Sequence, residues 1–226
     1  MGIAIVGAGG HGRVAMECLE LAMGTHDVAS FFDDRWDEIG TIENAPVLGP
    51  IESLLQDQHY ANVFVAIGNN VVRQKLLCQL VAAGKQILTI VHPHTMISPR
   101  AHLQEGVIAI AGTVVNRGAQ VGRGAILNTL CSVGHDCLIK DFAQIAPGVN
   151  LGGAAIIGEG AFLGIGSKVV PEARIGAWSI VGAGSVVVGD LPSGSLCHGT
   201  PARVIRQLRP DELPPDIDLS ALDSHT

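Results

Sequence analysis

The chain has 226 residues, a formal net charge of −7, 47% hydrophobic residues, 4% aromatic residues and 29 glycines. A mean hydropathy of +0.37 excludes a disordered chain, and the absence of a Gly-X-Y period excludes collagen, although glycine stands at about twice its usual share of roughly 7%. The acidic balance without a basic block argues against nucleic-acid binding, and no apolar run is long enough to insert into a membrane.

The first half of the chain alternates short apolar runs with helical patterns. These patterns predict strands at residues 3–6, 28–32, 62–67 and 87–90, and helices at residues 13–23, 50–58 and 70–83. Strands that alternate with helices are typical of a small parallel α/β domain. We therefore expect a Rossmann-like domain over residues 1–92, which ends where Pro93 stops the last strand.

A glycine-rich loop, Gly7-Ala8-Gly9-Gly10-His11-Gly12, follows the first predicted strand. Small residues at this place let backbone N–H groups at a helix N-terminus approach a diphosphate. Asp33 and Asp34 end the second strand at a spacing that could reach a ribose hydroxyl. The pattern does not separate NAD from a nucleotide-diphosphate sugar, and a tight turn without a ligand also stays open.

The second half of the chain repeats with a period of six. Residues 96–191 divide into sixteen consecutive hexads, whose second position is aliphatic in fifteen and whose sixth position is small in thirteen. All seventeen glycines of this segment fall at positions three, four or five. A fixed hexapeptide period indicates a parallel β-helix, which we expect over residues 93–206, followed by an extended or mobile tail over residues 207–226.

The register of the hexads explains how they fill a core. Position six and the next position two are two residues apart, so they point to the same face of a short strand and alternate small with large side chains inside. Glycine at positions three to five suits the corners, where the backbone adopts angles that other residues reach only at a cost. Hexapeptide-repeat proteins wind three hexads into each left-handed coil, and we expect the same here.

His135 is the candidate for catalysis in the repeats. It occupies position four of its hexad, so its ring should project from a corner, where Gly134 leaves room and Asp136 could orient the imidazole. Cys131 and Cys137 occupy inward positions and are not expected to act as nucleophiles. The five cysteines contain no C-x-x-C pair, which favours reduced thiols in a cytoplasmic protein.

Several separate motifs together resemble the NeuD/PglD-like family of hexapeptide-repeat sugar acetyltransferases. The similarity runs to about residue 206 and rests on these segments in order: Gly7–Gly12, Phe31-Phe32-Asp33-Asp34, Ala66-Ile67-Gly68-Asn69-Asn70 with Arg73, Ile97-Ser98-Pro99, Leu127-Asn128-Thr129, Val133-Gly134-His135-Asp136-Cys137, Phe162-Leu163-Gly164-Ile165 and Gly199-Thr200-Pro201-Ala202-Arg203. The resemblance implies an α/β domain that holds a nucleotide sugar, a homotrimer formed through the β-helices, and acetyl-CoA in the groove between neighbouring subunits.

The same resemblance implies roles for individual residues. His135 would be the general base, with Asp136 orienting it and Asn128 near the reacting centre. The expected contacts to the nucleotide sugar are Gly9, Gly10, His11, Asp33, Asp34, Gly68 and Asn69, and those to the acetyl donor are Gln144, Ile165 and Ala183. Two residues depart from relatives: Gln144 stands where relatives often have a second histidine, and Gly134 replaces an acidic residue seen in some of them.

The resulting hypothesis is an acetyl-CoA-dependent N-acetyltransferase of glycan biosynthesis. It would act on the 4-amino group of a nucleotide-linked 4-amino-4,6-dideoxysugar by direct transfer, with neither the nucleotide nor the sugar's stereochemistry specified. O-acetylation of sialic acid is the alternative, and an NAD-binding oxidoreductase is a weaker one that lacks an evident hydride acceptor. A trimeric β-helix metalloenzyme needs several histidines, yet the repeats contain only His102 and His135, so we expect no metal.

Overall fold

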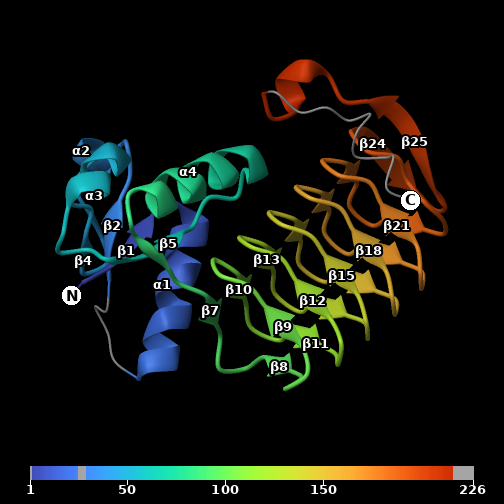
Figure 1. Cartoon of the computed structure of the whole chain (residues 1–226), viewed down its shortest axis with the longest axis horizontal. Helices are drawn as coiled ribbons and strands as arrows, with labels where there is room; N and C mark the ends of the chain where they lie inside the picture. Colours follow the sequence, from blue (N-terminus) through green and yellow to red (C-terminus); the bar gives the residue numbers. More distant parts are fainter. Residues whose placement is uncertain (1, 25–28, 216–226) are drawn as a thin grey trace. The chain divides into compact units, whose positions relative to one another are not determined.

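A parallel α/β unit and a parallel β-helix follow each other along the chain (Figure 1). The computed structural model describes residues 2–24 and 29–215, and the chain divides into the units Met1–Pro93 and His94–Thr226. Within the described residues, no helix is long and apolar enough to cross a membrane.

The first unit is built on a four-stranded parallel sheet. Its strand order is β2-β1-β5-β6, and Ile3 of β1 lies opposite Ala29 of β2 and Asn62 of β5. The strands of this sheet are β1 (Ile3–Val6), β2 (Ala29–Phe32), β5 (Asn62–Val65) and β6 (Gln86–Ile87). Their near-continuous apolar runs are typical of strands buried on both faces, which confirms the predicted α/β architecture.

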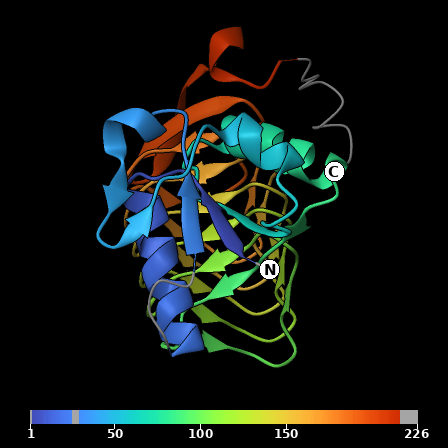
Figure 2. The same ribbon diagram turned by 90° about the vertical axis from the view of Figure 1, so that its left-hand side faces the viewer.

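Four helices complete the described part of this unit: α1 (Gly10–Met23), α2 (Trp36–Ile39), α3 (Ile51–Gln56) and α4 (Asn70–Ala82). Figure 2 shows α1 and α4 beside the strands of this unit. Helix α1 buries Ala15, Cys18 and Leu19, and its C-terminus is closed by Gly24 in the left-handed region at φ 68°. Helix α1 begins three residues before the predicted start, because the second half of the glycine loop already forms its first turn.

Two parts of this unit differ from the sequence prediction. Helix α2 and the hairpin of β3 (Thr41–Ile42) and β4 (Ala45–Pro46) were not predicted, because elements of two to four residues with few buried positions leave no periodic pattern. The strand predicted at residues 87–90 is wrong as a single element. The chain forms β6 and then β7 (Ile90–Val91), and Val28 of the second predicted strand lies outside the described residues.

Every hexad of the second unit begins with a two-residue strand. These strands are β8 (Met96–Ile97), β9 (His102–Leu103), β10 (Ile108–Ala109), β11 (Val114–Val115), β12 (Gln120–Val121), β13 (Ile126–Leu127), β14 (Ser132–Val133), β15 (Leu138–Ile139), β16 (Gln144–Ile145), β17 (Asn150–Leu151), β18 (Ile156–Ile157), β19 (Phe162–Leu163), β20 (Lys168–Val169), β21 (Arg174–Ile175), β22 (Ile180–Val181) and β23 (Val186–Val187). Each pairs in parallel with the strand 18 residues away, as His102 does with Gln120 and Val114 with Ser132. The predicted coil of three hexads is therefore confirmed.

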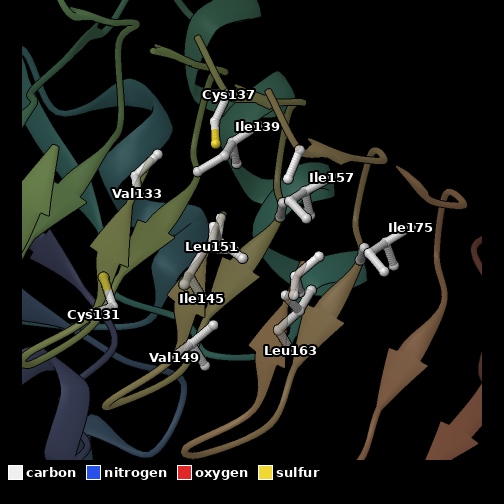
Figure 3. Packing of buried hydrophobic residues seen from close by; sticks show 14 of the residues in the cluster. Cys131, Val133, Cys137, Ile139, Ile145, Val149, Leu151, Ile157, Leu163 and Ile175 are labelled. Atoms are coloured by element: carbon white, nitrogen blue, oxygen red, sulfur yellow. The ribbon is translucent and has the colours of Figure 1, made fainter. Parts of the chain in front are cut away.

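Positions two and six of the hexads fill the interior of the β-helix. Figure 3 shows Val133, Ile139, Ile145 and Leu151 pointing into this core, together with the side chain of Cys131. Larger side chains from position two alternate with small ones from position six, such as Ala143 and Ala155, so the narrow interior is filled without aromatic rings.

The corners share a left-handed backbone at position five, which the glycine pattern revealed only in part. Within the described residues, position five of the fourteen consecutive hexads from Gly106 to Gly184 lies in the left-handed region, with φ between 56° and 74°. Eight of these residues are glycines, and the six others are Leu130, Asp136, Phe142, Ala154, Glu172 and Trp178. A non-glycine residue adopts this conformation at a cost, so the surrounding coil must hold it there.

The β-helix ends in an antiparallel pair, β24 (Ser195–Gly199) and β25 (Ala202–Gln207). A 3₁₀ turn, Pro210–Glu212, follows, and the carboxylate of Glu212 accepts two 2.7 Å hydrogen bonds from the guanidinium of Arg206. The described part of the predicted tail is thus folded back onto β25 rather than simply extended.

Candidate functional site

The glycines of the first loop serve two different purposes. Gly7 has φ 101° and donates its N–H to the Phe32 carbonyl at 2.8 Å, and a Cβ on Gly12 would collide with the Gly7 carbonyl oxygen. These two glycines are required by the turn itself. At Gly9, Gly10 and Gly68, by contrast, a Cβ would meet no atom within 4 Å.

The first turn of α1 presents an open anion-binding surface. Gly9 caps the helix without a side-chain hydrogen bond, and the first turn holds no acidic residue. The N–H groups at a helix start lack partners within the helix and carry the positive end of its dipole. With the missing side chains of Gly9 and Gly10, this surface could receive a diphosphate, as the sequence predicted.

Asp33 and Asp34 organise the chain around this loop. The Asp33 carboxylate accepts the Ala8 N–H at 2.8 Å and the Arg35 N–H at 3.0 Å. The Asp34 carboxylate accepts the N–H of Ile51, the first residue of α3, at 3.0 Å. Both carboxylates therefore have a local structural role, while their contact with a ribose or sugar stays a prediction.

Arg73 is a buried residue of this region to which the sequence analysis gave no role. Its side chain is 1% exposed and donates to the Ile67 carbonyl at 2.9 Å, to the Gly68 carbonyl at 3.3 Å and to Asn70 Oδ1 at 2.8 Å. Burial lowers the pKa of Arg73 to about 9. The sequence signal for its burial was its helical spacing from Leu77 and Leu80, which places Arg73 on the buried face of α4.

His11 and Asn69 lie on the helix starts next to these loops. Burial, and then the positive charge of Arg73, lower the pKa of His11 to about 4, so its imidazole is neutral near pH 7. The buried Nε2 of His11 has no hydrogen-bond partner among the described residues. Asn69 caps α4 by accepting the Val72 N–H at 3.0 Å.

His135 and Asp136 form an exposed pair on a corner of the β-helix. The pair lies between β14 and β15, and His135 Nδ1 is 2.9 Å from Asp136 Oδ2, with 67% and 64% of the two side chains exposed. A carboxylate can only accept, so Nδ1 carries the proton of this hydrogen bond, and the neutral ring then has its lone pair on Nε2. This arrangement can take up a proton from a substrate.

The other predicted residues of the β-helix lie elsewhere on the same chain. The 18-residue register places His135 on the corner of residues 116–118, 134–136, 152–154, 170–172 and 188–190, which we call the His135 corner. It places Asn128, Ile165 and Ala183 on the corner of residues 128–130, 146–148, 164–166 and 182–184, the Asn128 corner. Ile165 is 62% exposed, and Asn128 Oδ1 accepts the Thr129 N–H at 2.8 Å.

Gln144 lies on the outer side of β16, between Ile126 of β13 and Phe162 of β19. It is half-buried and belongs to neither corner. Within one chain, the structure therefore does not bring His135 together with Asn128, Gln144, Ile165 or Ala183.

The cysteines of the repeats point into the core and are not poised for chemistry. Cys131 and Cys137 are buried, and burial raises the pKa of the Cys131 thiol to about 11. Among the described residues, no group of three or more His, Cys, Asp or Glu side chains could hold a metal ion.

An α/β unit with an open helix N-terminus, joined to hexapeptide coils that carry a histidine–aspartate pair, defines a hexapeptide-repeat transferase. The PglD N-terminal domain family model matches residues 2–80, and the bacterial transferase hexapeptide model (six repeats) matches residues 154–189. PerB from Caulobacter crescentus, solved with CoA and GDP-perosamine, is 38% identical over 91% of this chain and 98% of its own, with a TM-score of 0.86.

Two further relatives agree with this match. The acetyltransferase domain of PglB from Neisseria gonorrhoeae, solved with acetyl coenzyme A, is 35% identical over 90% of this chain and 98% of its own, with a TM-score of 0.85. UDP-N-acetylbacillosamine N-acetyltransferase from Bacillus subtilis is 35% identical over 117 residues, or 48% of this chain. The chain spans about half the length of the curated relatives it matches. It belongs to the PglD-like family of hexapeptide-repeat sugar N-acetyltransferases, enzymes of the acyltransferase class.

Proposed function

We propose that this chain transfers the acetyl group of acetyl-CoA to the 4-amino group of a nucleotide-linked 4-amino-4,6-dideoxysugar. The observation that carries the proposal is the exposed His135–Asp136 pair on a β-helix corner, in a chain similar along nine-tenths of its length to a protein solved with both CoA and GDP-perosamine. Because the relatives' names include both GDP- and UDP-linked sugars, the proposal covers the substrate class and leaves the nucleotide open.

In the proposed mechanism, His135 is the general base. A sugar amine is mostly ammonium at neutral pH and must lose a proton before its nitrogen can attack the thioester carbonyl. Nε2 of His135 accepts that proton, and the neutral amine attacks the carbonyl carbon. The C–N bond forms, the C–S bond breaks, and the second proton of the amine passes to the sulfur, so CoA leaves as its thiol. Asp136 holds the ring through Nδ1, and this kind of base contributes about 10²–10⁴-fold to the rate.

The α/β unit binds the nucleotide sugar in this proposal. The open first turn of α1 receives the diphosphate, and Gly68 leaves similar room on the neighbouring loop. The neutral His11 then offers a hydrogen bond rather than a positive charge to the substrate.

We assign the acetyl donor to a groove between subunits of a cytoplasmic homotrimer. The support is that His135 and the Asn128 corner lie on different corners of one chain, so a neighbouring copy is needed to bring them together. Gln144 would donate its amide to the thioester, so Gln144→Ala should raise KM for acetyl-CoA several-fold while Gln144→His is tolerated.

The reaction class is tested by following acetyl-CoA consumption with a panel of GDP-, UDP- and dTDP-linked 4-amino sugars, their 4-hydroxy counterparts and free sialic acid. We expect turnover with at least one 4-amino sugar and none with its 4-hydroxy counterpart. Turnover on sialic acid alone would overturn N-acetylation in favour of O-acetylation. No turnover on any member of the panel would overturn the proposed substrate class.

A further inference from the structure

The imidazole of His135 lies against a glycine of the next coil. Gly153 follows His135 by 18 residues, at the same place on the His135 corner. The three atoms nearest to a Cβ built on Gly153 all belong to the His135 ring: Nε2, Cε1 at 2.6 Å and Cδ2 at 2.9 Å. No real Cβ tolerates contacts of this length, so the ring occupies the space that a side chain at residue 153 would need.

The fold itself gives little reason for glycine at residue 153. Gly153 does not lie in the left-handed region, so its backbone suits any residue. Its neighbour Gly152 is different, because a Cβ there would collide with the backbone nitrogen of Pro171. An alanine at residue 153 meets only the movable end of a side chain, which makes this glycine a requirement of the His135 ring and not of the coil.

The carboxylate of the pair rests on a glycine of the preceding coil. Asp136 has φ 58°, and this left-handed backbone directs its side chain towards Gly118, 18 residues earlier. The atom nearest to a Cβ built on Gly118 is Asp136 Oδ1. Leu130 above Gly112 and Trp178 above Gly160 repeat this arrangement at the other corners, so it follows from the coil geometry.

We propose that Gly153 is a positioning residue for the reaction: by lacking a side chain, it lets the His135 ring lie in the plane where Nδ1 meets Asp136 and Nε2 faces the substrate. The expected effect on kcat rests on the proposed function. The expected effect on the position of the His135 ring does not. Any side chain at residue 153 turns the ring away from Asp136, or covers the base nitrogen.

The repeats supply matched controls for a test of this role. Gly189 occupies the same hexad position on the His135 corner, two coils later, and a Cβ there would meet no atom within 4 Å. Gly189→Ala should therefore change neither stability nor turnover. Gly152→Ala places a Cβ against the backbone of the next coil, so it should lower Tm by several degrees.

Gly153→Ala is the decisive variant. We expect its Tm to lie within about 2 °C of the wild type, its KM for the nucleotide sugar within twofold, and its kcat about 10²-fold lower, since a small misplacement of a reacting group has this effect. Turnover equal to that of Gly189→Ala would overturn the proposal. A Tm loss as large as that of Gly152→Ala would also overturn it, because the glycine would then serve the fold.

A spectroscopic readout separates this proposal from the proposed function. In ¹⁵N NMR spectra of the His135 ring, the wild type and Gly189→Ala should show one tautomer, with the proton on Nδ1. Gly153→Ala should show a mixture of tautomers, and spectra identical to the wild type would contradict the role of Gly153. The NMR result does not depend on any substrate. Inactivity on nucleotide sugars would therefore contradict only the proposed function and not the role of Gly153.

Discussion

At the scale of single residues, two histidines of this chain lie in opposite surroundings. His11 is half-buried, and burial followed by the positive charge of Arg73 lowers its pKa to about 4. His135 is exposed on a corner and bonded to the Asp136 carboxylate. Burial makes the first ring a neutral hydrogen-bonding group, while exposure and an acidic partner suit the second to proton transfer.

The burial of His11 predicts a pH-dependent stability. As the pH falls below 6.5, the unfolded chain takes up a proton on this ring before the folded chain does, so the unfolding free energy decreases between about pH 6.5 and 4. We expect this ring to lower the unfolding free energy by about 2 kcal/mol at pH 5 relative to pH 7, as measured by urea unfolding. His11→Asn should lack this component, and an unchanged pH dependence in that variant would contradict the account.

The candidate site was only partly predictable at this scale. His135 and Asp136 are adjacent in the sequence, so their 2.9 Å contact needs only a corner to hold them. The buried position of Arg73 depends on carbonyl groups of the loop at residues 67–68, which converge on it only in the folded chain. The contact of His135 with Gly153 depends on the 18-residue register. The hexad period contains this register, but the contact is recognised only when residues 18 positions apart are compared.

At the scale of elements, the hexad is the unit that determines the structure of the second half of the chain. Its period predicted the strand positions, the inward residues and the glycine corners, because each coil repeats one local geometry. The non-glycine residues with a left-handed backbone at position five were not predicted, because the coil stabilises a conformation that a residue such as Leu130 avoids by itself. The short elements α2, β3 and β4 had no period to reveal them.

Inward and outward residues of one coil should therefore differ in their effect on stability. Leu163 is fully buried in the core, so Leu163→Ala should lower the unfolding free energy by about 2–5 kcal/mol. Ile165 lies two residues later and is largely exposed, so Ile165→Ala should change it by less than about 0.5 kcal/mol. Equal losses in chemical unfolding of the two variants would contradict the assigned interior.

At the scale of the whole molecule, the proposed assembly makes a prediction about mixed subunits. If each active site combines the His135 corner of one subunit with the Asn128 corner of its neighbour, His135→Ala and Asn128→Ala subunits carry complementary defects. A mixed trimer then contains some sites with both corners intact. The two variants co-refolded should give more turnover than either variant gives alone, and a mixture no more active than its components would contradict a site shared between subunits.

The central claim is that His135 removes the proton from the sugar amine, and its most direct test is the turnover of His135→Ala. On the nucleotide-linked 4-amino sugar with the highest turnover, kcat should fall by at least about 10²-fold, while the Kd for the nucleotide sugar and the oligomeric state stay unchanged. A His135→Ala enzyme with near-normal kcat would contradict the account.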